Sequence, residues 1–484
     1  MLSALKAIYH DVQCSVRCNG VYTEWFQVTG GLKQGCLLSP LLFNLYVNDL
    51  IGEINSLEEG IEIGDERLNL LLYADDIVLV APSEAGLQRM LTCLNTWCNK
   101  WRLKINVDKT KVVHFRVTGT PQTGATFHCG DDVVDIVSQY RYLGLIVSEF
   151  MDYNIMSKAV AQSAGRALGL IIAKSKAYGG IPYECFTKLY NALVIPIFNY
   201  GADIWGTREF THVNGIHNRA CRFFLGLGKS APTAAAQGDM GWPQLICQQW
   251  STVTRLWCKM AKMSVDRINK KVFLYCNNKA GGRCQNWCFR VKKFYNKVDL
   301  GGLTELADVA ECSTKLAAKT VHEVVFNSEK AKWLQTVNMQ TARRGAGLNK
   351  LRTYNKFKQV FEVESYVLEG NMSRGRRSAL AKFRCGVAPI RLETGRYENL
   401  SVDQRVCPFC ATSVEDESHV ILDCQTYADI RAPLVQAAFN INPLLRGNDN
   451  ELLHFILSND EICTLSAKTL FRILKCRREM LYST

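Results

Sequence analysis

Two adjacent carboxylates, Asp75 and Asp76, are the residues of this sequence best suited to metal-ion chemistry. They lie within residues 68–81, between two apolar runs of β-favouring side chains, and this pattern predicts a mostly buried β-hairpin with the pair at its turn. Two anions side by side against a dry sheet repel each other, so such a site needs a proton or a bound cation. A divalent cation held by carboxylate oxygens meets that need. Because Asp is also common in turns, a solvent-exposed turn without a ligand is the alternative.

Four residues near the C-terminus have the spacing of a second metal site. Two residues separate Cys407 from Cys410, eight separate Cys410 from His419, and four separate His419 from Cys424. A pair of thiolates at this spacing forms one half of a tetrahedral site, and a His and a Cys from the next element can form the other half. The pattern predicts a closed, structural Zn²⁺ site, because no ligand position is left for water. Four unrelated buried side chains are the alternative.

The charge of the chain points to a polyanionic partner. The formal net charge is +13 over 484 residues, and residues 341–384 alone hold eleven basic against three acidic side chains. Tyr354, Phe357 and Phe361 lie among these charges, a mixture that suits contacts to a nucleic-acid backbone together with base stacking. The same aromatic residues could equally belong to an ordinary core.

The composition also bounds the class of protein. A hydrophobic content of 48% predicts a chain that buries a core in several domains. Twenty cysteines are scattered along it, without the framework of a secreted protein, which favours an intracellular location in the nucleus or cytoplasm. No uncharged apolar run is long enough to span a bilayer, so no membrane contact is expected.

The elements before the carboxylate pair can be placed from their turns and caps. Asn19-Gly20 predicts a hairpin, and a glycine-containing loop at residues 30–38 leads into a helix that we expect to run to about residue 54. Ser39 is expected to cap this helix, with Pro40 at its first position.

The elements after the pair follow the same logic. An apolar stripe predicts a helix over residues 84–101, and a second hairpin is expected around Gly130-Asp131. Residues 140–147 are expected to form one strand, in which Gly144 indicates a close approach of another part of the chain. Beyond residue 150 the apolar period becomes helical.

This order of elements resembles the palm of the reverse transcriptases of non-LTR (LINE-type) retrotransposons. Residues 34–43 resemble the loop and helix that hold the templating base and the incoming nucleotide in that family. Tyr73-Ala74-Asp75-Asp76 resembles its catalytic metal motif. Residues 103–111 resemble the palm motif that follows, and Tyr142-Leu143-Gly144 resembles the primer grip.

The resemblance continues more loosely towards the C-terminus. Residues 199–205 and 219–222 resemble the family's thumb, and the Cys407 to Cys424 cluster is similar to the zinc knuckle that ends many of these polyproteins.

The resemblance implies an α+β fold. The partial palm would be an antiparallel sheet with helices, followed by a helical thumb, a mostly helical region and a small zinc-binding module. The implied domains are the C-terminal part of the palm at 1–150, the thumb at 151–250, a basic helical connection at 251–400, and the zinc knuckle with C-terminal helices at 401–484.

The resemblance also implies RNA-directed DNA synthesis with two Mg²⁺ ions. Asp75 would be the principal metal ligand and Asp76 its support. The residues implied to contact nucleotide, template or primer are Gln34, Gly35, Ser39, Pro40, Tyr73, Lys109, Leu143 and Gly144. The partners would be an RNA template, a DNA primer or target, dNTP and other proteins encoded by the same element.

One carboxylate of the family's palm has no counterpart here. In the family it lies upstream of the loop at residues 34–43, where this sequence has only Asp11 and Glu24, neither in the family's surrounding pattern. We therefore expect a chain that begins after that motif, lacks the fingers and has little or no polymerase activity alone. A non-catalytic nucleic-acid-binding protein derived from a retroelement is the alternative function, and a decayed reading frame without a stable product is a third.

Overall fold

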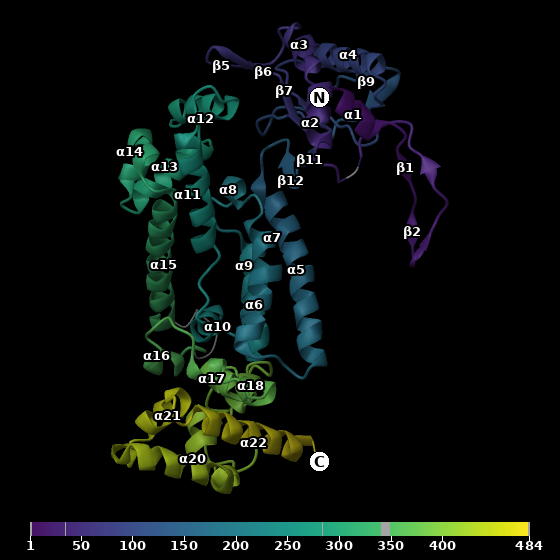
Figure 1. The fold of residues 1–484 in the computed structure, drawn as a ribbon. Coiled ribbons are helices and arrows are strands. Elements are labelled where there is room, and N and C mark those ends of the chain that lie inside the picture. The colour runs from purple at the N-terminus through teal and green to yellow at the C-terminus, as the bar shows by residue number, and fades with distance from the viewer. Residues whose placement is uncertain (1, 34, 283, 340–348, 483–484) are drawn as a thin grey trace. The chain divides into compact units, whose positions relative to one another are not determined.

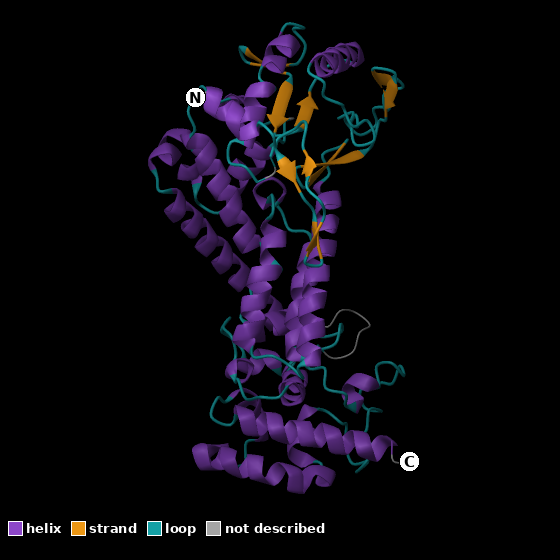
Figure 2. Ribbon diagram, turned by 45° about the vertical axis from the view of Figure 1, so that its right-hand side comes forward, coloured by secondary structure: helices purple, strands orange, loops and turns teal. Residues whose placement is uncertain are grey.

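The computed structural model describes residues 2–33, 35–282, 284–339 and 349–482. The chain divides into two compact units, residues 1–140 and 141–484. Strands are found in the first unit and near the start of the second, and helices make up most of the remainder (Figure 2).

The first unit mixes short helices with two-stranded antiparallel ladders. Its pairs are β1 with β4, β2 with β3, β5 with β6, β7 with β8, and β9 with β10. The element bounds are α1 (Leu2–Tyr9), β1 (Gln13–Cys14), β2 (Arg17–Cys18), β3 (Val21–Tyr22), β4 (Phe26–Gln27), α2 (Ser39–Tyr46), α3 (Asp49–Asn55), β5 (Ile61–Ile63), β6 (Glu66–Leu68), β7 (Leu70–Tyr73), β8 (Asp76–Leu79), α4 (Glu84–Lys100), β9 (Phe127–Cys129) and β10 (Asp132–Val134).

The local patterns formed the expected hairpins. Asn19 and Gly20 both have positive φ, 50° and 87°, as the turn between β2 and β3 requires. Gly130, at φ 66°, lies between β9 and β10. The predicted α+β class, with small antiparallel sheets, is confirmed.

Helix α4 organises the core of the first unit. The Ser83 hydroxyl accepts a hydrogen bond from the Gly86 amide at 3.1 Å and caps its N-terminus. The apolar stripe of α4 is buried against α3 and one face of β7–β8. The Trp97 indole also donates to Asp49 at 3.0 Å, which fixes α4 to the start of α3.

The second unit is almost wholly helical. Its strands are β11 (Gln139–Tyr142), within which the division of the chain falls, and β12 (Leu145–Ser148). Its helices are α5 (Tyr153–Ala177), α6 (Tyr183–Leu193), α7 (Ile195–Asn199), α8 (Ala202–Trp205), α9 (Thr211–Leu225), α10 (Thr233–Met240), α11 (Ile246–Lys262), α12 (Ile268–Asn278), α13 (Trp287–Lys297), η1 (Gly301–Thr304), α14 (Leu306–Glu311), α15 (Thr314–Asn338), α16 (Tyr354–Phe357), α17 (Ser365–Leu368), α18 (Arg374–Arg384), α19 (Arg391–Thr394), η2 (His419–Asp423), η3 (Gln425–Tyr427), α20 (Ala428–Ile441), η4 (Pro443–Leu445), α21 (Asp449–Ser458) and α22 (Cys463–Tyr482).

The packing of this unit joins segments far apart in the sequence. Helix α15 lies along α11, and the C-terminal helices α20, α21 and α22 form a layer next to α18 (Figure 1). One hydrophobic core runs through α5, α6, α9, α18 and these C-terminal helices. Core residues from both sides of residue 400 pack in this cluster, and core residues from both sides of residue 250 pack in another. The domain limits at residues 150, 250 and 400 stay predictions. No helix in the described ranges is long and apolar enough to cross a membrane.

Candidate functional site

The carboxylate pair occupies a tight β-turn. The register of β7 and β8 pairs Leu72 with Ile77 and Tyr73 with Asp76, which leaves Ala74 and Asp75 as the two loop residues. Ala74 has φ +52°, a conformation that costs free energy for a residue with a Cβ and that two-residue hairpins require. The turn therefore holds two consecutive carboxylates at the tip of a fixed hairpin.

The prediction of a mostly buried hairpin is wrong. Asp75 and Asp76 are both exposed, as is Tyr73 at 63%. The reason is that β7 and β8 form a ladder of only two strands, which α3 and α4 cover on one face. Because water solvates both carboxylates, the fold is stable without a cation at this turn. The carboxylate oxygens are nevertheless accessible to a divalent cation, whose coordination shell water would complete.

A third ligand does not join this pair within the described part of the chain. Among the described residues, the Cys407 cluster is the one place where three or more His, Cys, Asp or Glu side chains bring their ligand atoms together. Asp11 is exposed and accepts a hydrogen bond from Gln27 at 2.6 Å. Glu24 is also exposed. The hairpin alone therefore supplies a partial shell for Mg²⁺.

Contrary to the sequence prediction, Ser39 does not cap α2 but binds the loop that precedes this helix. The N-cap position is Leu38, and Ser39 makes no capping bond. Its buried hydroxyl instead donates to the Lys33 carbonyl at 2.9 Å and lies 3.0 Å from the Tyr9 hydroxyl. Ser39 thus closes the loop across residues 33–39.

Other predicted residues of this loop have different surroundings. Gly35 is exposed at φ +79°, and Gln34 lies outside the described residues. Pro40 is exposed in the first turn of α2. The single helix expected as far as residue 54 is divided, with α2 ending at Tyr46 and α3 beginning at Asp49.

Leu143 and Gly144 form a turn rather than the middle of one strand. They have φ 45° and 79° and connect β11 with β12. The Tyr200 hydroxyl donates to the Leu143 carbonyl at 2.7 Å, and a Cβ on Gly144 would lie 2.8 Å from the Tyr200 ring. The predicted close approach at Gly144 is confirmed, and sequence reasoning missed Tyr200 because the contact spans 57 residues.

Gly144→Ala is expected to destabilise the second unit by roughly 1–3 kcal/mol, because it adds backbone strain at positive φ and a clash with Tyr200. Urea unfolding of the full chain measures this loss. Gly169→Ala is the matched control: that glycine lies inside α5 with nothing within 4 Å of an added Cβ, so stability should stay equal or rise. Equal losses of unfolding free energy in the two variants would contradict the close contact between Gly144 and Tyr200.

The predicted contact residues are divided between the two units. Gly35, Ser39, Pro40, Tyr73 and the carboxylate pair belong to the first unit. So does Lys109, which is exposed and whose carbonyl accepts from the Tyr140 hydroxyl at 3.0 Å. Leu143 and Gly144 belong to the second unit.

The C-terminal Cys and His residues come together as predicted. The ligand atoms of Cys407, Cys410, His419 and Cys424 all lie within 4.8 Å of one another. The Cys407 and Cys424 sulfurs are 3.9 Å apart, and the Cys410 sulfur is 3.3 Å from His419 Nε2. Thiolates bound at about 2.3 Å to a tetrahedral zinc lie about 3.8 Å apart, so this donor set fits Zn²⁺.

Hydrogen bonds around the cluster orient its histidine. His419 Nδ1 is 2.9 Å from the Ser413 hydroxyl, which leaves Nε2 directed at the cluster, and the His419 amide donates to Asp416 at 2.8 Å. Partners of this kind fix the tautomer of a metal-binding histidine. Hydrogen bonds, chiefly from the Thr412 side chain, lower the pKa of Cys410 to about 6, which favours the thiolate that a metal needs.

In the described part of the basic stretch, residues 349–384, three cations are buried: Lys358, Arg377 and Arg384. Arg384 is 1% exposed and forms ion pairs with Asp239 and Glu364 at 3.0 and 2.8 Å. Lys358 is 5% exposed and also pairs with Glu364. Arg352 contacts Glu393 and Glu417.

The aromatic residues of this stretch are not a stacking surface. Tyr354 and Phe361 are buried, at 0% and 7% exposure, and Phe357 packs partly buried against the same core clusters. The alternative of an ordinary core is therefore the right one. Arg343 and Arg344 lie outside the described residues.

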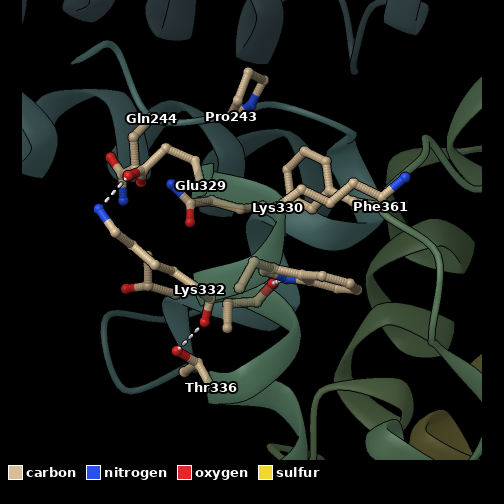
Figure 3. Close-up of a pocket in the computed structure, with 11 residues that line it drawn as sticks. Pro243, Gln244, Glu329, Lys330, Lys332, Thr336 and Phe361 are labelled. Atoms are coloured by element: carbon tan, nitrogen blue, oxygen red, sulfur yellow. Dashed lines mark hydrogen bonds and ion pairs between the residues drawn. The ribbon is translucent and has the colours of Figure 1, made fainter. Parts of the chain in front are cut away.

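A small pocket of about 200 Å³ lies beside α15 (Figure 3). The Lys332 ammonium contacts the Glu329 carboxylate at 2.6 Å, and the Trp333 indole donates to the Ala234 carbonyl at 2.8 Å. None of the catalytic, metal-binding or contact residues implied by the resemblance lines this pocket, so it is not the candidate site.

Comparison with known proteins finds relatives for the part of the chain that contains the Asp75–Asp76 hairpin. Residues 2–147 match the family model described as reverse transcriptase (RNA-dependent DNA polymerase). The chain is 28% identical over 228 residues to a probable RNA-directed DNA polymerase from transposon BS of Drosophila melanogaster, an alignment that covers 45% of this chain and 25% of that protein. It is 22% identical over 224 residues to the RNA-directed DNA polymerase from mobile element jockey of Drosophila funebris, covering 45% and 24%.

A third, shorter alignment has a higher sequence identity than these two. The Pol polyprotein from the type-2 retrotransposable element R2DM of Drosophila melanogaster is 32% identical over 146 residues, which covers 28% of this chain and 14% of that protein. Residues 2–147 are a reverse transcriptase domain, similar to the RNA-directed DNA polymerases of non-LTR retrotransposons. The matched region spans a quarter or less of the length of these relatives.

Proposed function

We propose that this chain takes part in RNA-templated DNA synthesis and that Asp75 and Asp76 hold its catalytic Mg²⁺ ions. Asp75 would be the principal ligand and Asp76 its support. In such chemistry two Mg²⁺ ions activate the primer 3′-hydroxyl and stabilise the leaving group. The observation that supports the proposal is the exposed two-residue turn that presents two carboxylates inside the reverse transcriptase domain.

The ligands of this activity would be an RNA template, a DNA primer or target, and dNTP. The proposed nucleotide and template contacts are Gln34, Gly35, Ser39 and Pro40. The proposed primer contacts are Tyr73, Leu143 and Gly144, and Lys109 is proposed to contact nucleotide, template or primer. Other proteins encoded by the same element are further proposed partners.

We also propose that the Cys407 cluster holds a structural Zn²⁺. Three thiolates and one imidazole occupy all four tetrahedral positions, so no position is left for a reacting water. None of the twenty cysteines, all of them in the described ranges, forms a disulfide, as expected for the reducing compartment that we propose, the nucleus or the cytoplasm.

The partial metal shell leads us to propose little or no polymerase activity for this chain alone. We expect Mg²⁺-dependent dNTP incorporation on primed RNA to equal that of the Asp75→Asn variant. Binding of Mn²⁺, followed by electron paramagnetic resonance, should still be weakened by Asp75→Asn. Asp65→Asn removes an exposed turn carboxylate from the neighbouring β5–β6 hairpin and should leave Mn²⁺ binding unchanged.

Two outcomes would decide against parts of this proposal. Rapid incorporation that depends on Asp75 would overturn the low activity. Equal Mn²⁺ binding by wild type and Asp75→Asn would remove the pair as a metal site. A non-catalytic nucleic-acid-binding protein is the second candidate function, favoured by the lack of a third described ligand beside the pair.

A further inference from the structure

A groove of about 800 Å³ lies between α18, α22 and the segment that begins the Cys407 cluster. Its sixteen described lining residues include five basic side chains and no acidic one. Lys382, from the basic stretch, lines the groove, whereas none of the catalytic, metal-binding or contact residues implied by the resemblance does.

Two of the five cations are already neutralised within the fold. Arg477 is held by Glu415 through contacts of 2.8 and 2.7 Å, and Arg391 is held by Glu398 at 2.6 and 2.9 Å. Lys475 has a longer contact of 3.7 Å with Glu479, and both side chains are more than half exposed, so this pair is weak.

Lys382 and Arg478 are the cations most open to a ligand. Neither forms an ion pair with a described residue. Burial lowers the pKa of Lys382, because its charge is partly desolvated without a nearby carboxylate. An anion in the groove would relieve that cost.

Apolar and aromatic surface lies beside these cations. Phe471, Leu474, Lys475, Arg478, Leu481 and Tyr482 recur on one side of α22. Phe471 is 39% exposed and Tyr482 is 83% exposed. Gly375 of α18 allows the close approach of the Phe471 ring, since a Cβ there would lie 2.8 Å from it. The Phe471 ring thus lies against α18 with part of its surface open.

We propose that this groove binds single-stranded nucleic acid, with phosphates at Lys382 and Arg478 and bases against Phe471 and Tyr482. Cations that follow a backbone, together with aromatic rings that stack on bases, are the general means of binding single strands. A duplex hides its base faces and would use only the cations. The choice of a nucleic acid over an acidic peptide rests on the proposed function.

The test measures binding of a fluorescein-labelled 12-nucleotide oligouridine to the full chain by anisotropy, with no Mg²⁺ or dNTP present. Lys382→Ala with Arg478→Ala is expected to weaken binding about tenfold or more and to reduce the slope of log affinity against log salt by about 1.4. Phe471→Leu is expected to weaken binding at least fivefold. Each variant's melting temperature is measured to show that it is folded.

The matched control is Lys468→Ala with Arg472→Ala. It removes the same charge from exposed positions of α22 that do not line the groove, so its effect should be less than threefold. Equal losses for the two double variants would overturn the proposal, because they would show general electrostatics. So would equal affinity for a 12-base-pair duplex, or stronger binding of a 12-residue Glu- and Phe-containing peptide.

The result is independent of polymerase activity. Asp75→Asn should leave binding at the groove unchanged. Loss of oligouridine binding in the groove variants with Mn²⁺ binding at the hairpin intact would support the groove, whatever the outcome of the incorporation assay. Normal binding of oligouridine at the groove, without Mn²⁺ binding at the hairpin, would contradict the proposed function and leave the groove proposal intact.

Discussion

Removal of the proposed Zn²⁺ from the Cys407 cluster is expected to unfold much of the C-terminal layer. Cys407 and Cys424 are each 1% exposed and belong to the same core as α5, α9 and α22. Structural zinc sites contribute roughly 10–16 kcal/mol of apparent binding free energy in small peptides, which is comparable with the ~5–15 kcal/mol stability of a whole domain. A chelator should therefore lower the melting temperature strongly and expose apolar surface.

Cys407→Ala should reproduce this effect without a chelator. Circular dichroism melting, together with the metal content of the purified protein, provides the measurement. Cys247→Ala is the matched control, since Cys247 is fully buried outside the cluster, and this variant should respond to chelator as the wild type does. If the purified protein contains no metal and the chelator does not change its melting temperature, the four residues are only packed together.

The second large effect is expected for Arg384→Met. Arg384 donates to both carboxylate oxygens of Asp239 at 3.1 and 3.0 Å, and Asp239 also accepts from the Tyr354 and Tyr366 hydroxyls at 3.0 and 2.6 Å. Removal of the cation leaves Asp239 buried without its countercharge. Loss of one partner of such a pair costs about 3–5 kcal/mol.

Urea unfolding of wild type and variant measures this cost. Lys188→Met is the matched control, because it removes a cation from the exposed pair with Glu184 on α6, where both side chains are more than three-quarters exposed; its cost should be below about 0.5 kcal/mol. A small cost for Arg384→Met, equal to that of Lys188→Met, would mean that Asp239 is protonated in the folded protein.

The same ion pair predicts a dependence of stability on pH. Burial alone would raise the pKa of Asp239, but the Arg384 guanidinium outweighs it and holds the pKa below its usual range. A carboxyl whose pKa is lowered by folding stabilises the fold above its unfolded pKa of about 3.9 and loses this contribution as the pH falls. Acid unfolding of wild type should therefore steepen below about pH 4, and Asp239→Asn should flatten that dependence.

The sequence by itself indicated most of the local elements and both candidate metal sites. Turn residues such as Asn19-Gly20, the apolar stripe of α4, and the spacing of Cys407, Cys410 and His419 act over a few positions, so their geometry depends on neighbours in the chain. The order of the elements up to Gly144 was likewise enough to indicate a reverse transcriptase palm, and the family match bears this out.

Only the tertiary structure decided which charged residues face water. Asp75 and Asp76 are exposed because their ladder has two strands and helices on one face. Arg384 is buried because a carboxylate 145 residues away neutralises it. Arg478, in contrast, remains in an open groove formed by segments from three parts of the chain. Burial and ion pairing depend on such distant partners, which no local pattern in the sequence records.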